Sequence, residues 1–171
     1  MNIKIIKDSE EYEGDIDKVI KETFEQDDEA NLVKQIRKIS NFYLSYIAID
    51  LDAKNKVVGH IMVSEMLLNN ESIILSLAPV SVAKEYQNYG VGSKLIKCVI
   101  KETMKYQDKY KLLSVLGSEH YYQRFGFESF DLKKFSIPFE VEPRFFQLLE
   151  LEKDCLKYLS GKFDYPEYYK D

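Results

Sequence analysis

Several features that define whole classes of proteins are scarce or missing in this sequence. Its 171 residues include no tryptophan, four prolines, seven glycines and two cysteines. Cys98 and Cys155 form no Cys-x-x-Cys pair and have no histidine nearby at a metal-binding spacing, which argues against a disulfide framework and against a zinc site. Free thiols are typical of a reducing compartment, so we expect a cytoplasmic protein without a metal ion.

Long apolar runs and an excess of positive charge are also missing. No run approaches the roughly 18 apolar residues that a membrane-spanning helix needs. Residues 1–6 lack the apolar core of a signal peptide. The formal net charge is −5 at pH 7, whereas a nucleic-acid-binding protein normally carries a basic surface. We therefore expect neither a membrane nor a nucleic acid as a partner.

The composition that remains is that of an ordinary soluble domain. Apolar residues make up 45% of the chain and charged residues 31%, which is enough for a sizeable core. A chain of this length is expected to form a single domain over residues 1–171.

The spacing of apolar residues changes character along the chain. Steps of three and four predict amphipathic helices over residues 11–26 and 29–39, with Asp27 and Asp28 between them supplying N-cap chemistry. Runs rich in aromatic and β-branched residues, separated by short polar turns, then predict an antiparallel meander of three strands. These strands are expected at residues 42–50, 57–68 and 72–82.

The rest of the chain mixes short strands and helices. The predicted strands are residues 2–7, 112–116, a strand from Phe127 onward and 145–151. The predicted helices run from Gly92 to about Tyr106, from 118 to 125 before Gly126, and from 154 to 159, ahead of a tyrosine-rich end at 163–169. This order predicts an α+β fold with a mixed, largely antiparallel central sheet flanked by helices.

Pro79 lies inside the third strand of the meander. Proline cannot donate a ladder hydrogen bond, so it marks an edge or a place where pairing stops. We therefore expect the sheet to be splayed at the strand that ends near Val82, with free backbone N–H and C=O groups beyond Pro79.

The segment Gln87-x-x-Gly90-x-Gly92 follows this strand and opens the next helix. Helix N-termini present unpaired N–H groups and the positive end of the helix dipole, and glycine lets a phosphate approach the backbone closely. The segment lacks the first glycine of G-x-G-x-x-G and the Gly-Lys-Ser/Thr ending of the P-loop. It indicates a pyrophosphate cradle of another kind, with a simple strand-to-helix turn as the alternative.

Two stretches of the chain resemble the GNAT superfamily of acyl-CoA N-acetyltransferases. The first is Leu77–Val82 followed by Glu85–Ile96, which is similar to the family's strand, Gln/Arg-x-x-Gly-x-Gly/Ala loop and helix. The second is Tyr121–Phe127, which is similar to the family's Tyr-x-x-x-Gly-Phe ending. The motif core thus spans residues 77–127, with a softer likeness outside it.

The resemblance implies acetyl-CoA as cosubstrate, no metal, and a set of cofactor-binding residues. Backbone groups of Val80, Ser81 and Val82 would pair with the pantetheine arm like a further strand, and an N–H near Val80 would polarise the thioester carbonyl. Backbone N–H groups of the following loop and helix start would hold the pyrophosphate. The residues concerned are Gln87, Asn88, Tyr89, Gly90, Val91, Gly92 and Ser93.

Tyr122 matches the family's tyrosine, four residues before Gly126, and is the implied catalytic residue. It would donate a hydrogen bond or a proton to the departing CoA thiolate, with aromatic packing as the alternative. A phenol pKa of about 10 against about 8.5 for a thiol makes full transfer uphill by roughly 2 kcal/mol, which favours a hydrogen bond unless the phenol pKa is lowered. Many family members carry an asparagine after the strand that ends near Leu116, whereas residues 117–120 here contain none.

No general base is assigned from the sequence. The candidates are Glu29, Glu65, Glu119 and His120, with a water-mediated base as an equal alternative. We expect a primary amine to attack acetyl-CoA directly in a ternary complex, because no cysteine lies on a nucleophile motif that could carry the acetyl group. The acceptor would be a small molecule or an exposed amino group. An acyl-CoA sensor without turnover is a second interpretation and a purely structural domain a third. The identity of the acceptor and a homodimeric assembly stay open.

Overall fold

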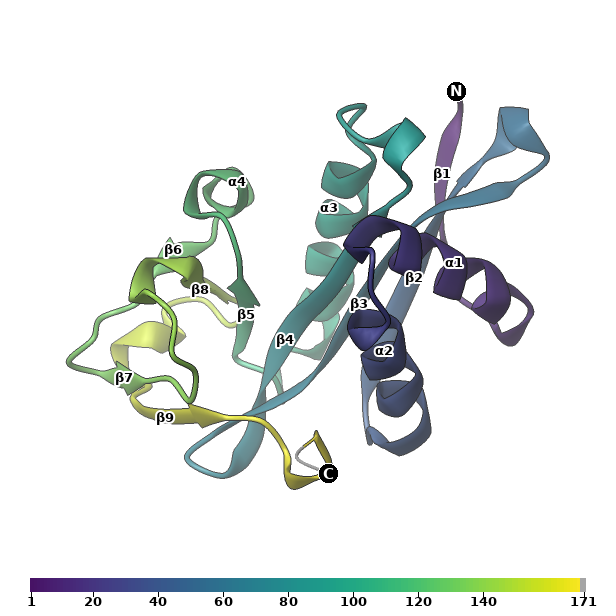
Figure 1. Ribbon diagram of the computed structural model, residues 1–171. Helices are drawn as coiled ribbons and strands as arrows, with labels where there is room; N and C mark the ends of the chain where they lie inside the picture. The colour runs from purple at the N-terminus through teal and green to yellow at the C-terminus, as the bar shows by residue number, and fades with distance from the viewer. Residues whose placement is uncertain (170–171) are drawn as a thin grey trace. The chain divides into compact units, whose positions relative to one another are not determined.

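A computed structural model describes residues 1–169 of the chain (Figure 1). Its α-helices are α1 (Glu13–Phe24), α2 (Asp28–Ile39), α3 (Val91–Thr103) and α4 (Glu119–Gln123). Its strands are β1 (Ile3–Lys7), β2 (Tyr43–Asp50), β3 (Lys56–Leu68), β4 (Glu71–Val82), β5 (Leu112–Leu116), β6 (Glu128–Ser129), β7 (Phe135–Ser136), β8 (Phe146–Glu150) and β9 (Gly161–Asp164). Short 3₁₀ helices lie at Glu10–Tyr12, Leu51–Ala53, Lys84–Tyr86, Met104–Tyr106, Pro143–Phe145, Cys155–Lys157 and Glu167–Tyr169.

The chain divides into two compact units. The first unit comprises Met1–Val63 with Pro79–Val99, and the second comprises Ser64–Ala78 with the residues from Ile100 onward. The strands β3 and β4 and the helix α3 contribute residues to both units. The single domain expected over residues 1–171 stays a prediction.

The first unit is a sheet of β1, β2, β3 and β4, in that order, with helices packed on it. β1 runs antiparallel to β2, with Ile3 opposite Asp50 and Lys7 opposite Tyr46. Figure 1 shows α1 and α2 next to each other beside β2 and β3. Both helices bury one apolar stripe, as their spacing predicts. The buried residues are Ile16, Val19 and Ile20 in α1 and Ala30, Val33 and Ile36 in α2.

Gly59 in β3 allows α3 to pack closely on the sheet of the first unit. A Cβ at Gly59 would lie 3.0 Å from Leu95 Cδ1 and 3.2 Å from Val91 Cγ1, both of α3, and 3.1 Å from the Ser81 carbonyl oxygen. Any larger residue would push helix and strand apart, so this glycine brings the start of α3 against the end of β4.

The N-terminus of α2 differs from the expected side-chain cap. Asp27 does occupy the N-cap position, but its side chain makes no capping hydrogen bond. Its backbone lies in the helical region, with φ −96° and ψ −12°, whereas a capping aspartate normally has extended dihedral angles. The Asp27 carboxylate instead lies 3.8 Å from Lys21 Nζ of the preceding helix.

The second unit has the strand order β3, β4, β5, β8, β6, with β9 pairing to β3 and β7 to β9. β5 runs parallel to β4 and antiparallel to β8, so the sheet is mixed as predicted. The core is apolar and rich in aromatic rings. Its buried members are Met66, Leu68, Ile74, Leu112, Phe135, Phe146, Leu148, Cys155 and Phe163. The strand β7 was not predicted from the sequence.

The pairing of β4 with β5 ends before Pro79, as the presence of a proline in β4 predicts. The register runs from Ile74 opposite Leu112 to Leu77 opposite Val115, whereas β4 itself continues to Val82. The expected α+β fold, with a largely antiparallel open sheet splayed at this strand, is therefore confirmed.

A clamp between Asn69 and the turn before β9 stabilises the second unit. The Asn69 side chain donates to the Ser160 carbonyl at 2.8 Å and accepts from the Lys162 N–H at 2.9 Å. Gly161 lies between these partners with φ +131°, and a Cβ there would lie 2.0 Å from Asn69 Oδ1. Both the backbone angle and the space require glycine at this position.

Gly161→Ala is expected to destabilise the protein by roughly 2–4 kcal/mol, because it combines a strained φ with the loss of the Asn69 clamp. Urea denaturation followed by circular dichroism measures this change. Gly14→Ala is the control, since a Cβ at Gly14 in α1 meets nothing within 4 Å and should raise stability by up to about 1 kcal/mol. Equal midpoints for Gly161→Ala and the wild type would contradict the clamp.

Candidate functional site

The turn between β4 and α3 is exposed and has an unusual backbone. Asn88 and Gly90 have φ values of +67° and +81°, in a region that favours asparagine and glycine. The Lys94 N–H donates to the Gly90 carbonyl at 3.1 Å, so Gly90 is the last residue before the helix. The N–H groups of Val91 and Gly92 therefore belong to the first turn, which has no intrahelical acceptor for them.

The space above Gly90 is open. Apart from Gly90 itself, its chain neighbours and the helix backbone, no heavy atom lies within 4 Å of the position that a Cβ would occupy, and residues 87–90 are exposed. An anionic group can therefore reach the first-turn N–H groups of α3 without displacing protein atoms. A phosphate fits this arrangement, because the N–H groups and the helix dipole favour negative charge at the same point.

The Gln87 side chain fastens this turn to the end of β4. Its Nε2 donates to the Val82 carbonyl at 2.9 Å. The same carbonyl accepts from Thr23 Oγ1 at 3.1 Å. Both lone pairs of this oxygen are thus engaged, so a pantetheine arm would have to use other backbone groups of β4. Thr23 contacts the predicted cofactor strand from α1, a contact that the sequence did not reveal.

The side chains at the end of β4 alternate between two environments. Ser81 is fully buried, and its hydroxyl has no hydrogen-bond partner among the described residues. Val80 and Val82 are half-buried on the opposite side of the strand. The structure thus brings the predicted segments 80–82 and 87–93 together in the first unit, around the start of α3.

Tyr122 belongs to the second unit, in the short helix α4. The Ser118 side chain caps this helix by accepting from the Tyr121 N–H at 3.4 Å. The Tyr122 ring is half-buried and makes edge-to-face contacts with Tyr121 and Phe127, at centroid distances of 5.0 and 5.7 Å. Its hydroxyl makes no hydrogen bond within residues 1–169, so it is able to donate one to a substrate.

Burial raises the pKa of Tyr122 to about 12, with a smaller contribution from Tyr121. A phenol with this pKa stays protonated at every physiological pH. Complete proton transfer to a thiolate, whose conjugate acid has a pKa of about 8.5, would be uphill by roughly 5 kcal/mol. The structure thus strengthens the preference for hydrogen-bond donation over proton transfer.

Glu65 among the candidate bases is a buried structural carboxylate. It accepts hydrogen bonds from the Tyr110 hydroxyl at 2.8 Å and from the Ser72 hydroxyl, and Lys109 Nζ lies 3.6 Å away. A buried carboxylate with this many partners is satisfied by the fold itself.

The other candidate bases lie on helices and near the surface. Glu29 accepts from Gln26 Nε2 through both carboxylate oxygens, at 2.9 and 3.0 Å. Glu119 accepts from Gln123 Nε2 at 3.2 Å, and His120 is exposed. None of these contacts singles out a base, so none is assigned.

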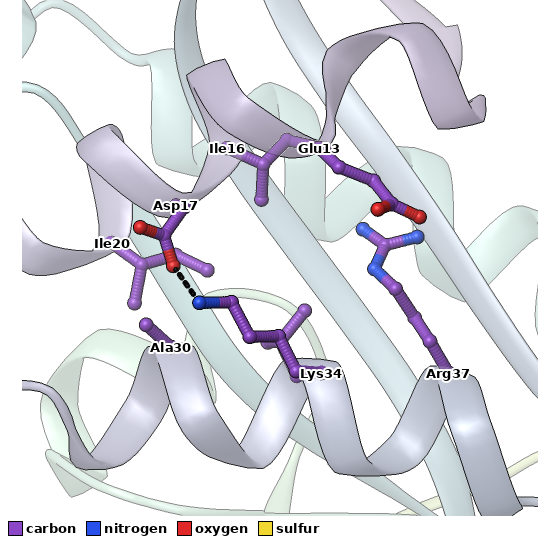
Figure 2. A pocket seen from close by; sticks show the side chains of 8 residues that line it. Glu13, Ile16, Asp17, Ile20, Ala30, Lys34 and Arg37 are labelled. Carbon is purple, nitrogen blue, oxygen red and sulfur yellow. Dashed lines mark ion pairs between the residues drawn. The ribbon is translucent and has the colours of Figure 1, made fainter.

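The crevice between α1 and α2 is too small for a substrate. Its volume is about 40 Å³, compared with the 300–1,000 Å³ of typical ligand sites. In Figure 2 the Asp17 carboxylate and Lys34 close it, at 2.9 Å from each other, and Glu13 and Arg37 point toward one another at its other end. A cavity of this size holds at most a few waters.

Arg37 also belongs to a buried polar network of the first unit. It forms an ion pair with Asp8, and Asp8 Oδ2 accepts from the Ser45 hydroxyl at 2.7 Å. Ser45 Oγ lies 2.8 Å from His60 Nε2. Because the single Ser45 proton is directed to Asp8, His60 Nε2 must carry a hydrogen and donate it. His60 Nδ1 is buried and has no partner among the described residues.

This environment lowers the pKa of His60 to about 3, through burial first and through the charge of Arg37 second. The unfolded chain binds a proton at this histidine below about pH 6.5, whereas the folded chain does not. Stability is therefore fully present above about pH 6.5 and falls as the pH drops below it.

Between pH 7 and pH 5 this histidine is expected to cost the wild type about 2 kcal/mol of unfolding free energy. His60→Gln removes the titration and keeps an amide donor for Ser45, so its stability should change less over the same range. Urea denaturation at the two pH values measures the difference. The sequence contains two histidines, and His120→Gln should retain the wild-type pH dependence. Parallel behaviour of wild type and His60→Gln would refute the assignment.

Two kinds of feature are absent from the part of the chain that the structure describes. No helix there is long and apolar enough to cross a membrane. No group of three or more histidine, cysteine, aspartate or glutamate residues there is arranged to hold a metal ion.

Comparison with known families identifies the class of protein. Residues 39–129, more than half of the chain, match the family described as acetyltransferase (GNAT) domain. The chain therefore belongs to the GNAT acetyltransferase family, as the two motifs indicated.

The chain is similar over most of its length to individual members of this family. It is 26% identical over 155 residues, 90% of each chain, to the uncharacterized N-acetyltransferase YhbS of Escherichia coli strain K12. The chain is also similar to the crystal structure of Escherichia coli YhbS in complex with CoA, with a TM-score of 0.88 and 24% identity. This match covers 100% of the present chain and 93% of the YhbS chain. A GNAT family acetyltransferase from Brucella melitensis, in complex with acetyl-CoA, has a TM-score of 0.76 and 25% identity, and 98% of each chain is covered.

Proposed function

We propose that this protein transfers the acetyl group of acetyl-CoA to a primary amine, by direct attack in a ternary complex. The observation that carries the proposal is the exposed turn before α3, where open space above Gly90 gives access to the first-turn N–H groups. Two similar proteins support the proposal, because YhbS was crystallised with CoA and the Brucella melitensis protein with acetyl-CoA.

The start of α3 would hold the pyrophosphate of the cosubstrate. Backbone N–H groups of residues 88–93 would be the donors, because they are strong hydrogen-bonding groups in a fixed array. The Gln87 N–H already donates to the Lys84 carbonyl at 3.3 Å. Backbone groups of Val80 and Ser81 would pair with the pantetheine arm, since the Val82 carbonyl is already engaged by Gln87 and Thr23. An N–H near Val80 would polarise the thioester carbonyl.

In the reaction, the lone pair of the neutral amine forms a bond to the thioester carbonyl carbon and the carbon–sulfur bond breaks. The sulfur leaves as a thiolate that takes up one proton, and the amine nitrogen loses one, so the products are an amide and free CoA. Tyr122 would donate a hydrogen bond to the sulfur as its negative charge develops. Water or an unassigned side chain accepts the proton from the amine.

The cysteines support direct transfer over a covalent acetyl-enzyme. Cys155 is buried, and burial raises the pKa of its thiol to about 12, so it is not a thiolate at neutral pH. Cys98 lies within α3 and is only partly exposed. Cys155 therefore lacks the accessible thiolate that an acyl-carrying residue needs, and Cys98 lies on no recognisable nucleophile motif.

Further aspects of the proposal concern partners and location. The acceptor would be a small molecule or an exposed amino group, in the cytoplasm, with no nucleic acid or membrane as partner. A homodimer is compatible with this activity. The alternative function is an acyl-CoA sensor that binds the cosubstrate without turnover.

Two measurements test the proposal. Acetyl-CoA at saturating concentration should raise the melting temperature, because a ligand at 100 times its Kd stabilises the folded state by about 2.7 kcal/mol. A panel of primary amines with acetyl-CoA should then release free thiol, detected with a chromogenic disulfide. Absence of any thermal shift would refute cosubstrate binding. A shift without thiol release across the panel would favour the sensor.

A further inference from the structure

The Tyr122 ring occupies the space that a side chain at position 117 would need. A Cβ built on Gly117 would lie 2.6 Å from Tyr122 Cε2, 3.3 Å from Cδ2 and 3.7 Å from Cζ. Distances below 3.0 Å essentially never occur for a real Cβ, so either the ring or the backbone would have to move. The Tyr122 ring therefore packs directly on the main chain at the end of β5.

The backbone of Gly117 is not what requires glycine. Gly117 is absent from the glycines with positive φ, which are Gly90, Gly126 and Gly161. Any L-residue can adopt its conformation, and alanine there would even reduce the entropy of the unfolded chain. Within residues 1–169, the three atoms nearest to a Cβ at this position all belong to the Tyr122 ring, so the ring accounts for the glycine.

The backbone at this position is also held in place. The Gly117 N–H donates to the Phe145 carbonyl at 2.8 Å, which ties the chain to the residue before β8. The adjacent Ser118 caps α4 through its side chain and also accepts from the Tyr122 N–H at 3.1 Å through its carbonyl. Because these bonds anchor the main chain, a new Cβ would displace the ring.

The other neighbours of the ring hold its edges. Tyr121 and Phe127 contact it edge to face, and Phe127 is almost completely buried. Gly117 and these two aromatic rings thus contact the Tyr122 ring from different directions. A ring pushed off Gly117 has to move against Phe127 or toward solvent, and its hydroxyl moves with it.

We propose that Gly117 is a positioning residue for Tyr122, whose lack of a side chain sets where the phenol hydroxyl lies. The catalytic part of this inference rests on the proposed function of Tyr122, while the packing part does not.

The catalytic part is tested with Gly117→Ala and Gly117→Asn. Both should lower kcat, by about 10- to 100-fold for alanine and by more for asparagine, because a displacement of about 1 Å in a reacting group can cost 100-fold. The KM for acetyl-CoA should stay unchanged. In a Tyr122→Phe background, Gly117→Ala should cause no further loss of kcat, because the hydroxyl that it displaces is gone. An asparagine that raises kcat, or an equal loss in both backgrounds, would overturn the proposal.

The packing part is tested by stability alone. Gly117→Ala should lower the melting temperature in the wild type and equally in Tyr122→Phe, which keeps the ring. In Tyr122→Ala, which removes the ring, the same change should leave the melting temperature unchanged or raise it. Gly14→Ala is the control, since its Cβ meets nothing within 4 Å, and its effect should be the same in every background.

The two parts fail separately. A melting-temperature loss from Gly117→Ala that persists in Tyr122→Ala would overturn the contact itself. The stability pattern could hold while neither the wild type nor any variant releases thiol from acetyl-CoA. In that case the proposed function is wrong, but the packing of Tyr122 on Gly117 is confirmed. If the protein turns over and kcat is indifferent to Gly117→Ala, Gly117 positions the ring but not the reaction, and the proposal is wrong.

Discussion

Replacing Tyr122 by phenylalanine is expected to lower kcat by about 10²- to 10³-fold and to leave the affinity for acetyl-CoA within about twofold of the wild type. The expected size is that of losing one preorganised donor to a developing negative charge. Phenylalanine keeps the ring contacts with Tyr121 and Phe127, so the change removes little more than the hydroxyl. Steady-state kinetics with thiol detection measure kcat, and calorimetric titration measures the affinity.

The pH profile and a neighbouring tyrosine sharpen this prediction. Since the pKa of Tyr122 is raised to about 12, its ionisation should produce no falling limb in kcat below about pH 10. Tyr121→Phe is the matched control in the same helix and should retain activity within a few fold. Full activity in Tyr122→Phe would show that the hydroxyl has no part in the reaction. A loss of acetyl-CoA affinity instead of kcat would assign Tyr122 to binding.

The strands and turns that have local signals were predictable from the sequence. The β3–β4 turn is an example, because Asn69 and Asn70 adopt φ values of +52° and +65°, a conformation that asparagine tolerates better than most residues. Pro79 likewise marked the end of pairing between β4 and β5. In both cases the chemistry of one or two residues determines the local geometry, so no knowledge of distant contacts is needed.

Other features depend on residues far apart in the chain and had no local signal. β7 and β9 pair with each other across some 25 residues, Phe135 opposite Gly161, and are only two and four residues long. Periodicity is unreadable in segments of that length. Glu65 was a candidate base by residue type, but its carboxylate accepts a hydrogen bond from the hydroxyl of Tyr110, which is distant in the sequence.

The candidate site shows the same division. The loop 87–93 was identified because glycines and a helix start are adjacent in the sequence. The tie from Gln87 to the Val82 carbonyl and the bond from Thr23 to the same oxygen were not, since residue type alone does not say where an amide or a hydroxyl will find its acceptor. The packing of the Tyr122 ring on Gly117 is also a matter of shape, which residue type alone does not predict.

The second large effect concerns Gly90. Gly90→Asp is expected to raise the Kd for acetyl-CoA by about 10²- to 10³-fold, because a carboxylate about 4 Å from a phosphate charge costs a few kcal/mol near a protein surface. Gly90→Asn is the matched control, since asparagine has the same shape and tolerates the φ of +81° at this position. Its Kd should rise less than about tenfold, and calorimetric titration measures both variants.

The difference between Asp and Asn isolates charge from shape. The two side chains fill the open space above Gly90 equally and offer the same oxygen to the first-turn N–H groups of α3. Whatever separates their Kd values is therefore repulsion between the carboxylate and the phosphates, and it should shrink as added salt screens exposed charges. Equal losses for Asp and Asn, unchanged by salt, would mean that the space above Gly90 is filled by an uncharged part of the ligand. The pyrophosphate would then have to lie elsewhere on the protein.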